Sequence, residues 1–297
     1  MEKFFAFVLI FLLLSCSHDG GTSENPKELT LNIATFNIRV LTDEDQDARS
    51  WEVRKSNVAS TIQDNDFDVV GLQEVLPAQQ YDLKKLLPDY SFYFVGRDDG
   101  TNGEAVGIAY KKSRFYPLNY LRFWLSPTPN QPSNASAWGG HPTRKRVVAV
   151  SRLVEINTRK QFYYLVTHME TGGSYAESRS KSAELIIERE VLLNIDDLPF
   201  FVAGDMNTTH PDENSMNVLR GVFNDTFCEA EEKGVREGPR GTYAGFNPDV
   251  DLDNEYRMLD YIFAKGDYML NSYRVIDAKY DGQYPSDHLP VVINVTM

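Results

Sequence analysis

The sequence contains very little cysteine. Cys16 and Cys228 are the two cysteines among its 297 residues. Two thiols supply neither a disulfide framework nor a thiolate cluster for structural zinc. If Cys16 carries a lipid, Cys228 has no cysteine partner within the chain, and we expect it to be a small packed side chain. Any metal site is therefore expected to use oxygen and nitrogen ligands.

Positive charge is also scarce. The chain has 30 Lys and Arg against 43 Asp and Glu, which gives a formal net charge of −13. An acidic surface repels polyanions at long range, and no Lys/Arg-rich stripe with interleaved aromatic residues is present. This disfavours nucleic acid as a partner but leaves a local basic cleft open. A Gly-x-Ser-x-Gly elbow and a P-loop are missing too, so no covalent intermediate is required.

The apolar run near the N-terminus is too short to cross a membrane. It covers residues 4–14, whereas a spanning helix needs about 20 residues. The run ends in Leu13-Leu14-Ser15-Cys16, which resembles a bacterial lipobox. We expect residues 1–15 to be a lipoprotein signal peptide, and residues 16–28 to comprise a lipidated Cys16 and a flexible tether. A plain signal peptide with an incidental cysteine is the alternative.

A lipid on Cys16 predicts a location at the cell envelope. It would anchor the protein to a bacterial membrane, which we expect to be the outer one, with the protein facing the periplasm or the surface. No second linker, repeat or low-complexity tract follows the tether. Residues 29–297 are therefore predicted to be one catalytic domain, and we expect a monomer.

Eight short apolar runs predict β-strands, and several of them are continuous, as is typical of strands covered on both faces. The runs are residues 31–36, 68–72, 106–110, 146–154, 162–167, 200–203, 261–264 and 291–295. Helical spacing predicts helices over residues 51–63 and 177–194. One face of the second helix is expected to carry Ala183, Ile186, Ile187 and Val191. Residues 111–145 are predicted to form a long irregular loop at the rim of a site. Strands with interspersed helices indicate a layered α/β fold.

Polar side chains stand at the ends of six predicted strands. Ligands bind outside strand ends in covered sheets, so these side chains are expected to converge. Their carboxylates, amides and imidazoles suit a divalent cation and a phosphate group. Each cluster alone is more typical of a turn, a helix cap or a core histidine, and only their joint occurrence favours a site. The clusters are Asn37, Gln73-Glu74, His168, Asp205-Met206-Asn207, Asp260 and Ser286-Asp287-His288.

The motifs around these residues resemble those of the endonuclease/exonuclease/phosphatase superfamily, over roughly residues 30–297. They are Thr35-Phe36-Asn37-Ile38-Arg39, Gly71-Leu72-Gln73-Glu74, Gly103-Glu104, Thr167-His168, Gly204-Asp205-Met206-Asn207, Arg257-Met258-Leu259-Asp260-Tyr261-Ile262 and Ser286-Asp287-His288. Three further stretches look like a bacterial branch of that superfamily: Ser50-Trp51-Glu52-Val53-Arg54-Lys55, Gly96-Arg97-Asp98-Asp99-Gly100 and Phe123-Trp124-Leu125-Ser126. The resemblance implies a DNase-like α/β fold, a four-layer α/β/β/α sandwich. In it, two mixed β-sheets pack face to face with helices outside.

The resemblance also implies a metal and a water-activating group. Glu74 matches the principal metal-ligand carboxylate, Asn37 lies beside it, and Asp287 matches the acid near the metal. Asp205 matches the residue that orients or deprotonates the attacking water, and Asn207 the residue that helps to position the phosphate. Carboxylate and amide oxygens without a thiolate cluster favour Mg²⁺ or Mn²⁺.

Two histidines are implied to contact phosphoryl oxygens. They are His168 and His288, with Glu104 expected to orient the first and Asp260 the second. A carboxylate beside an imidazole fixes its tautomer and raises its pKa. Arg146 is the candidate phosphate-binding arginine, with its neighbours Arg144 and Lys145 as alternatives. The chain has Glu170 where the superfamily often has a shorter Asp, which could change substrate contacts near His168.

These observations predict metal-dependent hydrolysis of a phosphate ester by an activated water, that is, a phosphodiesterase or a phosphatase. The alternatives are a secreted nuclease, a sphingomyelinase-like lipid phosphodiesterase, and a surface lipoprotein that uses an inactive hydrolase fold to bind a ligand. The substrate itself is set by rim loops in this superfamily, so the core motifs do not name it.

Overall fold

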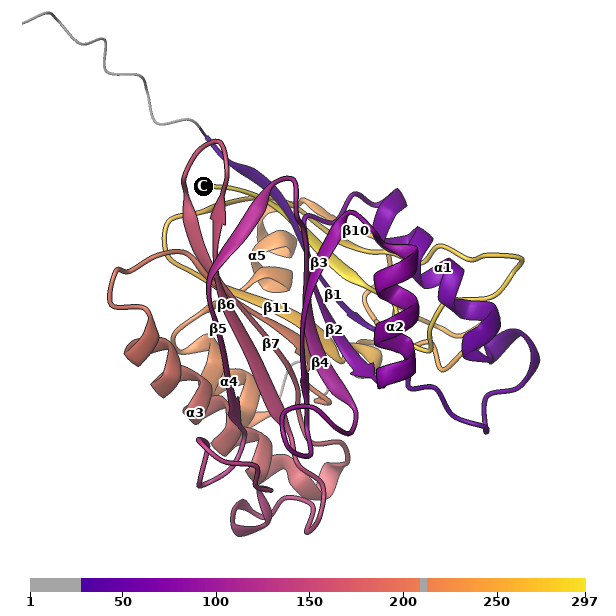
Figure 1. Cartoon of the computed structure of the whole chain (residues 1–297), viewed down its shortest axis with the longest axis horizontal. Helices are drawn as coiled ribbons and strands as arrows, with labels where there is room; N and C mark the ends of the chain where they lie inside the picture. Colours follow the sequence, from indigo (N-terminus) through magenta and orange to yellow (C-terminus); the bar gives the residue numbers. More distant parts are fainter. Residues whose placement is uncertain (1–27, 209–212) are drawn as a thin grey trace, which may run out of the picture.

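The computed structural model describes residues 28–208 and 213–297 (Figure 1). The predicted signal peptide, Cys16 and the tether up to residue 27 lie outside the described residues. Among the helices that the structure describes, none is long and apolar enough to span a membrane.

Two mixed β-sheets form the centre of the molecule (Figure 1). The seven-stranded sheet has the order β10-β12-β13-β1-β2-β4-β3, and the six-stranded sheet has the order β5-β6-β7-β8-β11-β9. In each sheet the two central strands are parallel, β1 with β2 and β7 with β8, and their other neighbours are antiparallel. The strands are β1 (Thr30–Asn37), β2 (Val69–Val75), β3 (Tyr90–Gly96), β4 (Ala105–Lys111), β5 (Phe115–Trp124), β6 (Val147–Glu155), β7 (Gln161–His168), β8 (Phe200–Asp205), β9 (Asn224–Asp225), β10 (Arg236–Glu237), β11 (Asp260–Lys265), β12 (Met269–Val275) and β13 (Val291–Thr296).

The sheets pack face to face through a continuous apolar core. At its centre the hydroxyl of the buried Tyr164 crosses from one sheet to the other and donates a hydrogen bond to the carbonyl of Ala34 at 2.6 Å. Gly71 lies opposite, where a Cβ atom would come within 2.5 Å of that hydroxyl and 2.7 Å of Val166. The missing side chain at Gly71 therefore allows this close approach.

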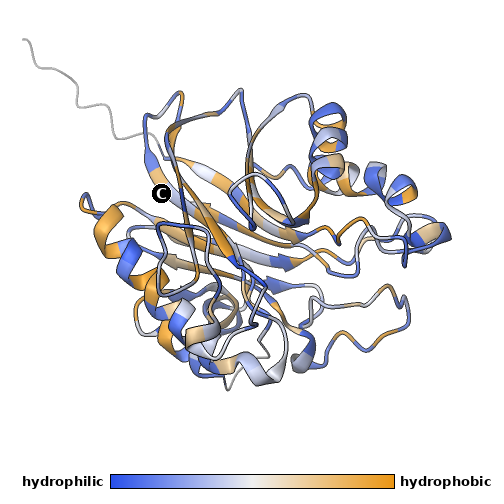
Figure 2. Cartoon of the chain, turned by 60° about the horizontal axis from the view of Figure 1, so that its bottom comes forward, coloured by the Kyte–Doolittle hydropathy of each residue, from blue (hydrophilic) through white to orange (hydrophobic). Residues whose placement is uncertain are grey.

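Helices cover the outer face of each sheet. The helices α1 (Trp51–Asp64) and α2 (Pro77–Leu86) pack on the seven-stranded sheet through a second apolar cluster. On the other side lie α3 (Ala176–Leu193) and α4 (Asn214–Arg220), and α5 (Thr226–Lys233) packs beside β11 and β12. Figure 2 shows the outer helices banded with alternating hydrophobic and hydrophilic residues, as expected for helices with one face against a sheet. The predicted four-layer sandwich is confirmed.

All eight predicted strands and both predicted helices are present. The prediction of an irregular segment over residues 111–145 was wrong in its first part, because Phe115–Trp124 forms the edge strand β5. Pro117 sits beside a bulge in that strand, a position that tolerates proline. Of the residues expected to share one face of α3, Ala183 and Ile186 are buried, whereas Val191 is 62% exposed.

Candidate active site

The strand ends meet at one edge of the two sheets and line a cavity of about 520 Å³. The register explains the convergence, because Asp205 at the end of β8 lies beside His168 on β7 and Asp260 on β11. Eight of the ten residues predicted for the site line this cavity. The other two, Asn37 and Asp260, stand behind it and hydrogen-bond its lining residues.

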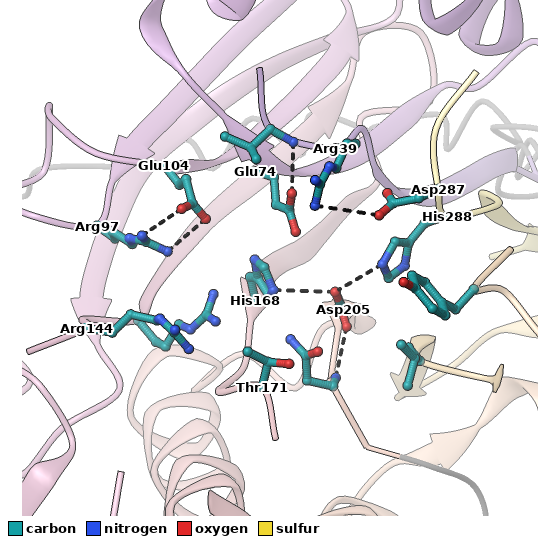
Figure 3. A pocket seen from close by; sticks show the side chains of 15 residues that line it. Arg39, Glu74, Arg97, Glu104, Arg144, His168, Thr171, Asp205, Asp287 and His288 are labelled. Carbon is teal, nitrogen blue, oxygen red and sulfur yellow. Dashed lines mark hydrogen bonds and ion pairs between the residues drawn. The ribbon is translucent and has the colours of Figure 1, made fainter. Parts of the chain in front are cut away.

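Asp205 is the centre of the cavity (Figure 3). Its Oδ2 accepts a hydrogen bond from Nδ2 of Asn37 at 3.0 Å and faces the Nε2 atoms of His168 at 3.4 Å and His288 at 3.8 Å. Its Oδ1 accepts the backbone N–H of Asn207 at 2.9 Å. Burial raises the pKa of Asp205, and the positive charge of His288 opposes that rise. A buried carboxylate between two imidazoles is well placed to orient a water or to take its proton.

The backbone is unusual at three cavity residues. Arg39, Glu74 and Asn207 all have positive φ angles, 60°, 65° and 51°, which non-glycine residues rarely adopt. Glu74 lies where the β2–β4 register shifts, between Leu72 and Val75. Such a bulge re-aims a side chain. Both Glu74 oxygens are held, one by Nδ2 of Asn37 at 3.1 Å and one by the backbone N–H of Val40 at 2.8 Å. Strained backbone of this kind clusters at functional sites.

His288 lies against Asp260, the carboxylate that was predicted to orient it. Its Nδ1 lies 2.8 Å from Oδ2 of the buried Asp260, which also accepts a hydrogen bond from the hydroxyl of Thr242 at 2.6 Å. Burial alone would lower the pKa of His288, but Asp260 and Asp205 outweigh it and raise that pKa well above its ordinary value. His288 is therefore a cationic donor at neutral pH. Thr242 carried no signal in the sequence.

His168 differs from its predicted arrangement. Glu104, its expected partner, instead binds both Nη atoms of Arg97, at 2.7 and 2.6 Å. The physical reason is that a guanidinium offers two parallel donors to a carboxylate and an imidazole offers one. Burial, followed by the nearby charge of Arg146, lowers the pKa of His168 well below its ordinary value. His168 is therefore neutral.

Arginines other than Arg146 also line the cavity, and one of them, Arg144, was a predicted alternative to Arg146. They are Arg39, Arg97 and Arg144. Glu170 is buried and accepts a hydrogen bond from Nη1 of Arg144 at 2.6 Å, and it lies 3.5 Å from Arg146. The departure from the superfamily at Glu170 was thus a usable signal, because the longer side chain reaches these arginines.

The carboxylates of the cavity fit a divalent cation. Glu74, His168 and Asp205 each offer one ligand atom, and these atoms lie within 4.8 Å of one another. Burial raises the pKa of Asp287, and the negative charge of Glu74 adds to the rise. Carboxylates that repel one another in a buried cavity are stabilised by a bound cation. Asn37 directs its amide nitrogen at two of them, so in this arrangement it ties Glu74 to Asp205.

Comparison with known proteins agrees with this geometry. Residues 34–288 match the model of the endonuclease/exonuclease/phosphatase family. A family member from Bacteroides thetaiotaomicron is 30% identical with a TM-score of 0.82, and the match covers 91% of this chain and 99% of that one. A mannosyl-6-phosphatase of the same species is also 30% identical, with a TM-score of 0.79 and coverage of 89% and 99%.

A more distant relative is an uncharacterised protein of Acanthamoeba polyphaga mimivirus. It is 24% identical over 265 residues, which are 77% of this chain, and the chain spans only 38% of its length. The family match and the two bacterial structures carry the assignment. The chain belongs to the endonuclease/exonuclease/phosphatase family, a family of phosphoester hydrolases.

Proposed function

We propose that this protein is a Mg²⁺- or Mn²⁺-dependent phosphatase of small, polar phosphate esters, soluble or linked to glycans. The observation that carries the proposal is the buried carboxylate of Asp205 between the two imidazoles, beside the acidic residues Glu74 and Asp287. Glu74, which belongs to the group of side chains that could hold a cation, would bind the metal, together with Asp287 and Asn37 as the sequence predicts. When bound, the metal would supply positive charge that offsets the charge of the phosphate.

The side chains then divide the remaining work. Asp205 orients the attacking water and takes its proton. His288 donates a charged hydrogen bond to a phosphoryl oxygen, and the neutral His168 donates through Nε2–H when Nδ1 is unprotonated. Asn207 lines the cavity beside Asp205 and is anchored there, because its Nδ2 donates to the carbonyl of Met169 at 2.9 Å. Arg146 contacts the phosphate from the opposite wall.

The substrate class follows from two observations. The cavity is lined mostly by charged and polar groups, and its apolar members are Val40 and Leu259. Such a lining suits a hydroxylated or charged alcohol better than the acyl chains of a lipid. The similarity to a mannosyl-6-phosphatase supports a sugar phosphate. The net charge of −13 continues to disfavour a nuclease.

The location is a separate part of the proposal. We propose a lipid on Cys16, attachment to a bacterial envelope membrane, and a monomeric enzyme, all on the basis of the sequence. Replacing Cys16 with Ala should abolish processing as a lipoprotein and change the mass of the mature protein. Unchanged processing would contradict the anchor without affecting the hydrolase.

A substrate panel tests the hydrolase. Mannose 6-phosphate, bis(p-nitrophenyl) phosphate, DNA and sphingomyelin are each incubated with the protein and Mg²⁺ or Mn²⁺. We expect phosphate release from the sugar phosphate as the preferred reaction. Asp205→Asn should abolish this release. Asp196→Asn is its matched control, because Asp196 is an exposed carboxylate that pairs with Arg152 outside the cavity. Preferred cleavage of DNA or sphingomyelin would support one of the alternatives, and no cleavage of any substrate would favour an inactive binding protein.

A further inference from the structure

Three arginines form one wall of the active-site cavity. We call Arg97, Arg144 and Arg146 the arginine wall. Figure 3 shows Arg97 and Arg144 on one side of the cavity and Asp287 and His288 on the other, with Glu74, His168 and Asp205 between them. Arg97 and Arg144 therefore lie beyond His168 as seen from Asp287 and His288.

The wall carries an excess of positive charge toward the cavity. Three guanidinium groups face two carboxylates, Glu104 and Glu170. Glu170 stands behind the arginines, since it is buried and does not line the cavity, whereas all three arginines do. The cavity surface on this side thus presents three guanidinium groups and a single carboxylate.

Two of the three guanidinium groups, those of Arg144 and Arg146, have donors without a hydrogen bond to the described residues. Arg146 is only 6% exposed, and its Nε has no hydrogen-bond partner among the described residues. The side chain of Arg144 donates one hydrogen bond to the described residues, from Nη1 to Glu170. Buried donors without a partner are costly, and a bound anion would satisfy them. The exposure of Arg97 and Arg144, 21% and 27%, extends the wall from the buried Arg146 toward the cavity mouth.

The backbone of each arginine is held in place. The carbonyl of Arg97 accepts a hydrogen bond from Nε1 of Trp124 at 2.7 Å, and the carbonyl of Arg146 accepts the N–H of Leu125 at 2.9 Å. The N–H of Arg144 donates to Nδ1 of His141 at 3.0 Å. Two of the stretches that carried no assigned function, Gly96-Arg97-Asp98-Asp99-Gly100 and Phe123-Trp124-Leu125-Ser126, thus build and brace this wall. Such bracing lowers the ordering cost of binding.

From these contacts we propose that the arginine wall is a subsite for a second anionic group, a phosphate or a carboxylate, on the alcohol part of the substrate. The inference rests on the proposed function and refines it. Arg146, at the inner end of the wall, contacts the scissile phosphate. Arg97 and Arg144 bind the second anion. An arginine pair offers bidentate donors to either kind of anion.

The test uses pairs of esters that differ in the second group alone. Glycerol 3-phosphate is compared with 3-phosphoglycerate, which has a carboxylate in place of a hydroxymethyl group. Fructose 1-phosphate is compared with fructose 1,6-bisphosphate, in which the second anion lies farther away. Cleavage at the 1-position of the bisphosphate is followed by the appearance of fructose 6-phosphate. We expect kcat/KM to be about tenfold or more higher for the ester with the second anion in at least one pair, the effect of a hydrogen bond between charged groups.

Two arginine variants locate the effect. Arg144→Gln should reduce the preference to about threefold or less, chiefly through KM, since one charged donor group is lost. Arg152→Gln is the matched control. Arg152 lies on β6, toward the end of the strand that is away from the cavity, and pairs with Asp196. The control should retain the full preference.

The outcomes separate the two proposals. Equal kcat/KM within both pairs, or a preference that survives Arg144→Gln, overturns the subsite while phosphate release upholds the hydrolase. If no ester is hydrolysed with Mg²⁺ or Mn²⁺, the proposed function fails. In that case, titration calorimetry measures the binding of the same ester pairs to Asp205→Asn in the presence of Mg²⁺. Equal Kd values within each pair would overturn the subsite.

Discussion

The two histidines of the cavity lie in different electrostatic surroundings. His288, which precedes β13 of the seven-stranded sheet, is fixed by Asp260 and Thr242 and is cationic. His168, at the end of β7 in the six-stranded sheet, has no such carboxylate behind it among the described residues, stands near Arg146, and is neutral. Oδ2 of Asp205 thus faces two imidazoles that differ in charge.

The difference shows how positive charge reaches a phosphate from two sides. On the His288 side, an imidazolium is kept charged by buried carboxylates. On the His168 side, guanidinium groups carry the charge, and they do so without titrating near neutral pH. A single kind of donor on both sides would place two imidazolium ions next to one another in a buried site, which is unfavourable.

After the loss of Asp205, the largest effects are expected from removing either imidazole. His168→Ala and His288→Ala should each lower kcat by about 10²–10³, since each removes a donor to the charge that develops in the transition state. Melting temperature should change little. If both histidines were only structural, the melting temperature would fall while the folded fraction kept near-normal turnover.

Breaking the carboxylate support should affect the two sides unequally. Asp260→Asn should lower kcat by about tenfold to a hundredfold, because the imidazole stays but its charge and tautomer are less well fixed. Glu104→Gln should act mainly on KM, because Glu104 positions Arg97 and not His168. Steady-state kinetics of both variants separates kcat from KM. An equal loss of kcat in both would contradict the asymmetry.

The charge states give an independent check without turnover. In metal-free protein, ¹⁵N NMR should find His288 protonated and His168 neutral throughout pH 6–8, because the pKa of the first lies well above the ordinary value and that of the second well below it. Asp260→Asn removes the carboxylate that raises the pKa of His288, so this ring should lose its proton at lower pH. Two imidazoles that titrate together near pH 6.5 would contradict the assignment.

The sequence predicted the centre of the molecule better than its edges. The inner strands other than β12 are largely continuous apolar runs and were predicted, whereas β12 is interrupted by polar residues and was missed. The pairing of Asp260 with His288 followed from their motifs. The edge strand β5 was missed because it alternates and is partly exposed, with Leu118 52% and Tyr120 40% accessible. The pairing of Glu104 with Arg97 was missed because it depends on side-chain geometry at the β3–β4 connection, which no sequence spacing encodes.

The motif around Arg54 also acquires a structural reason. Its buried guanidinium donates to the carbonyls of Ile38 at 2.8 Å and Pro285 at 2.9 Å, and so ties the segment after β1 to the one before Asp287. Burial lowers the pKa of Arg54 to about 10, which still leaves it charged. We therefore regard Arg54 as a positioning residue for the proposed metal ligands.

Arg54→Met should lower the free energy of unfolding by about 3 kcal/mol, because buried carbonyls lose their donor. It should also raise the metal concentration for half-activity several-fold. Arg54→Lys keeps the charge and should be milder on both measures. Lys55→Met is the control, since Lys55 pairs at the surface and such pairs contribute about 1 kcal/mol or less. A loss of stability with an unchanged metal requirement would reduce Arg54 to a structural role.

The smallest effect is expected from shortening Glu170. Glu170→Asp retains the charge but withdraws it from Arg144 and Arg146. We expect a change of only a few-fold in KM and an unchanged kcat, because the arginines stay in the cavity with less support. Steady-state kinetics with the preferred ester measures it. A large loss of kcat would instead indicate that Glu170 takes part in the reaction and does not only position the arginines.

The most direct measurement of the central claim is phosphate release as a function of Mg²⁺ or Mn²⁺ after exhaustive chelation, in the wild type and in Asp205→Asn. The proposed mechanism predicts no release without metal, a saturable rise as metal is added, and a rate at least about 10³-fold lower in Asp205→Asn at every metal concentration. Full activity in the chelated wild type, or near-normal activity in Asp205→Asn, would contradict it.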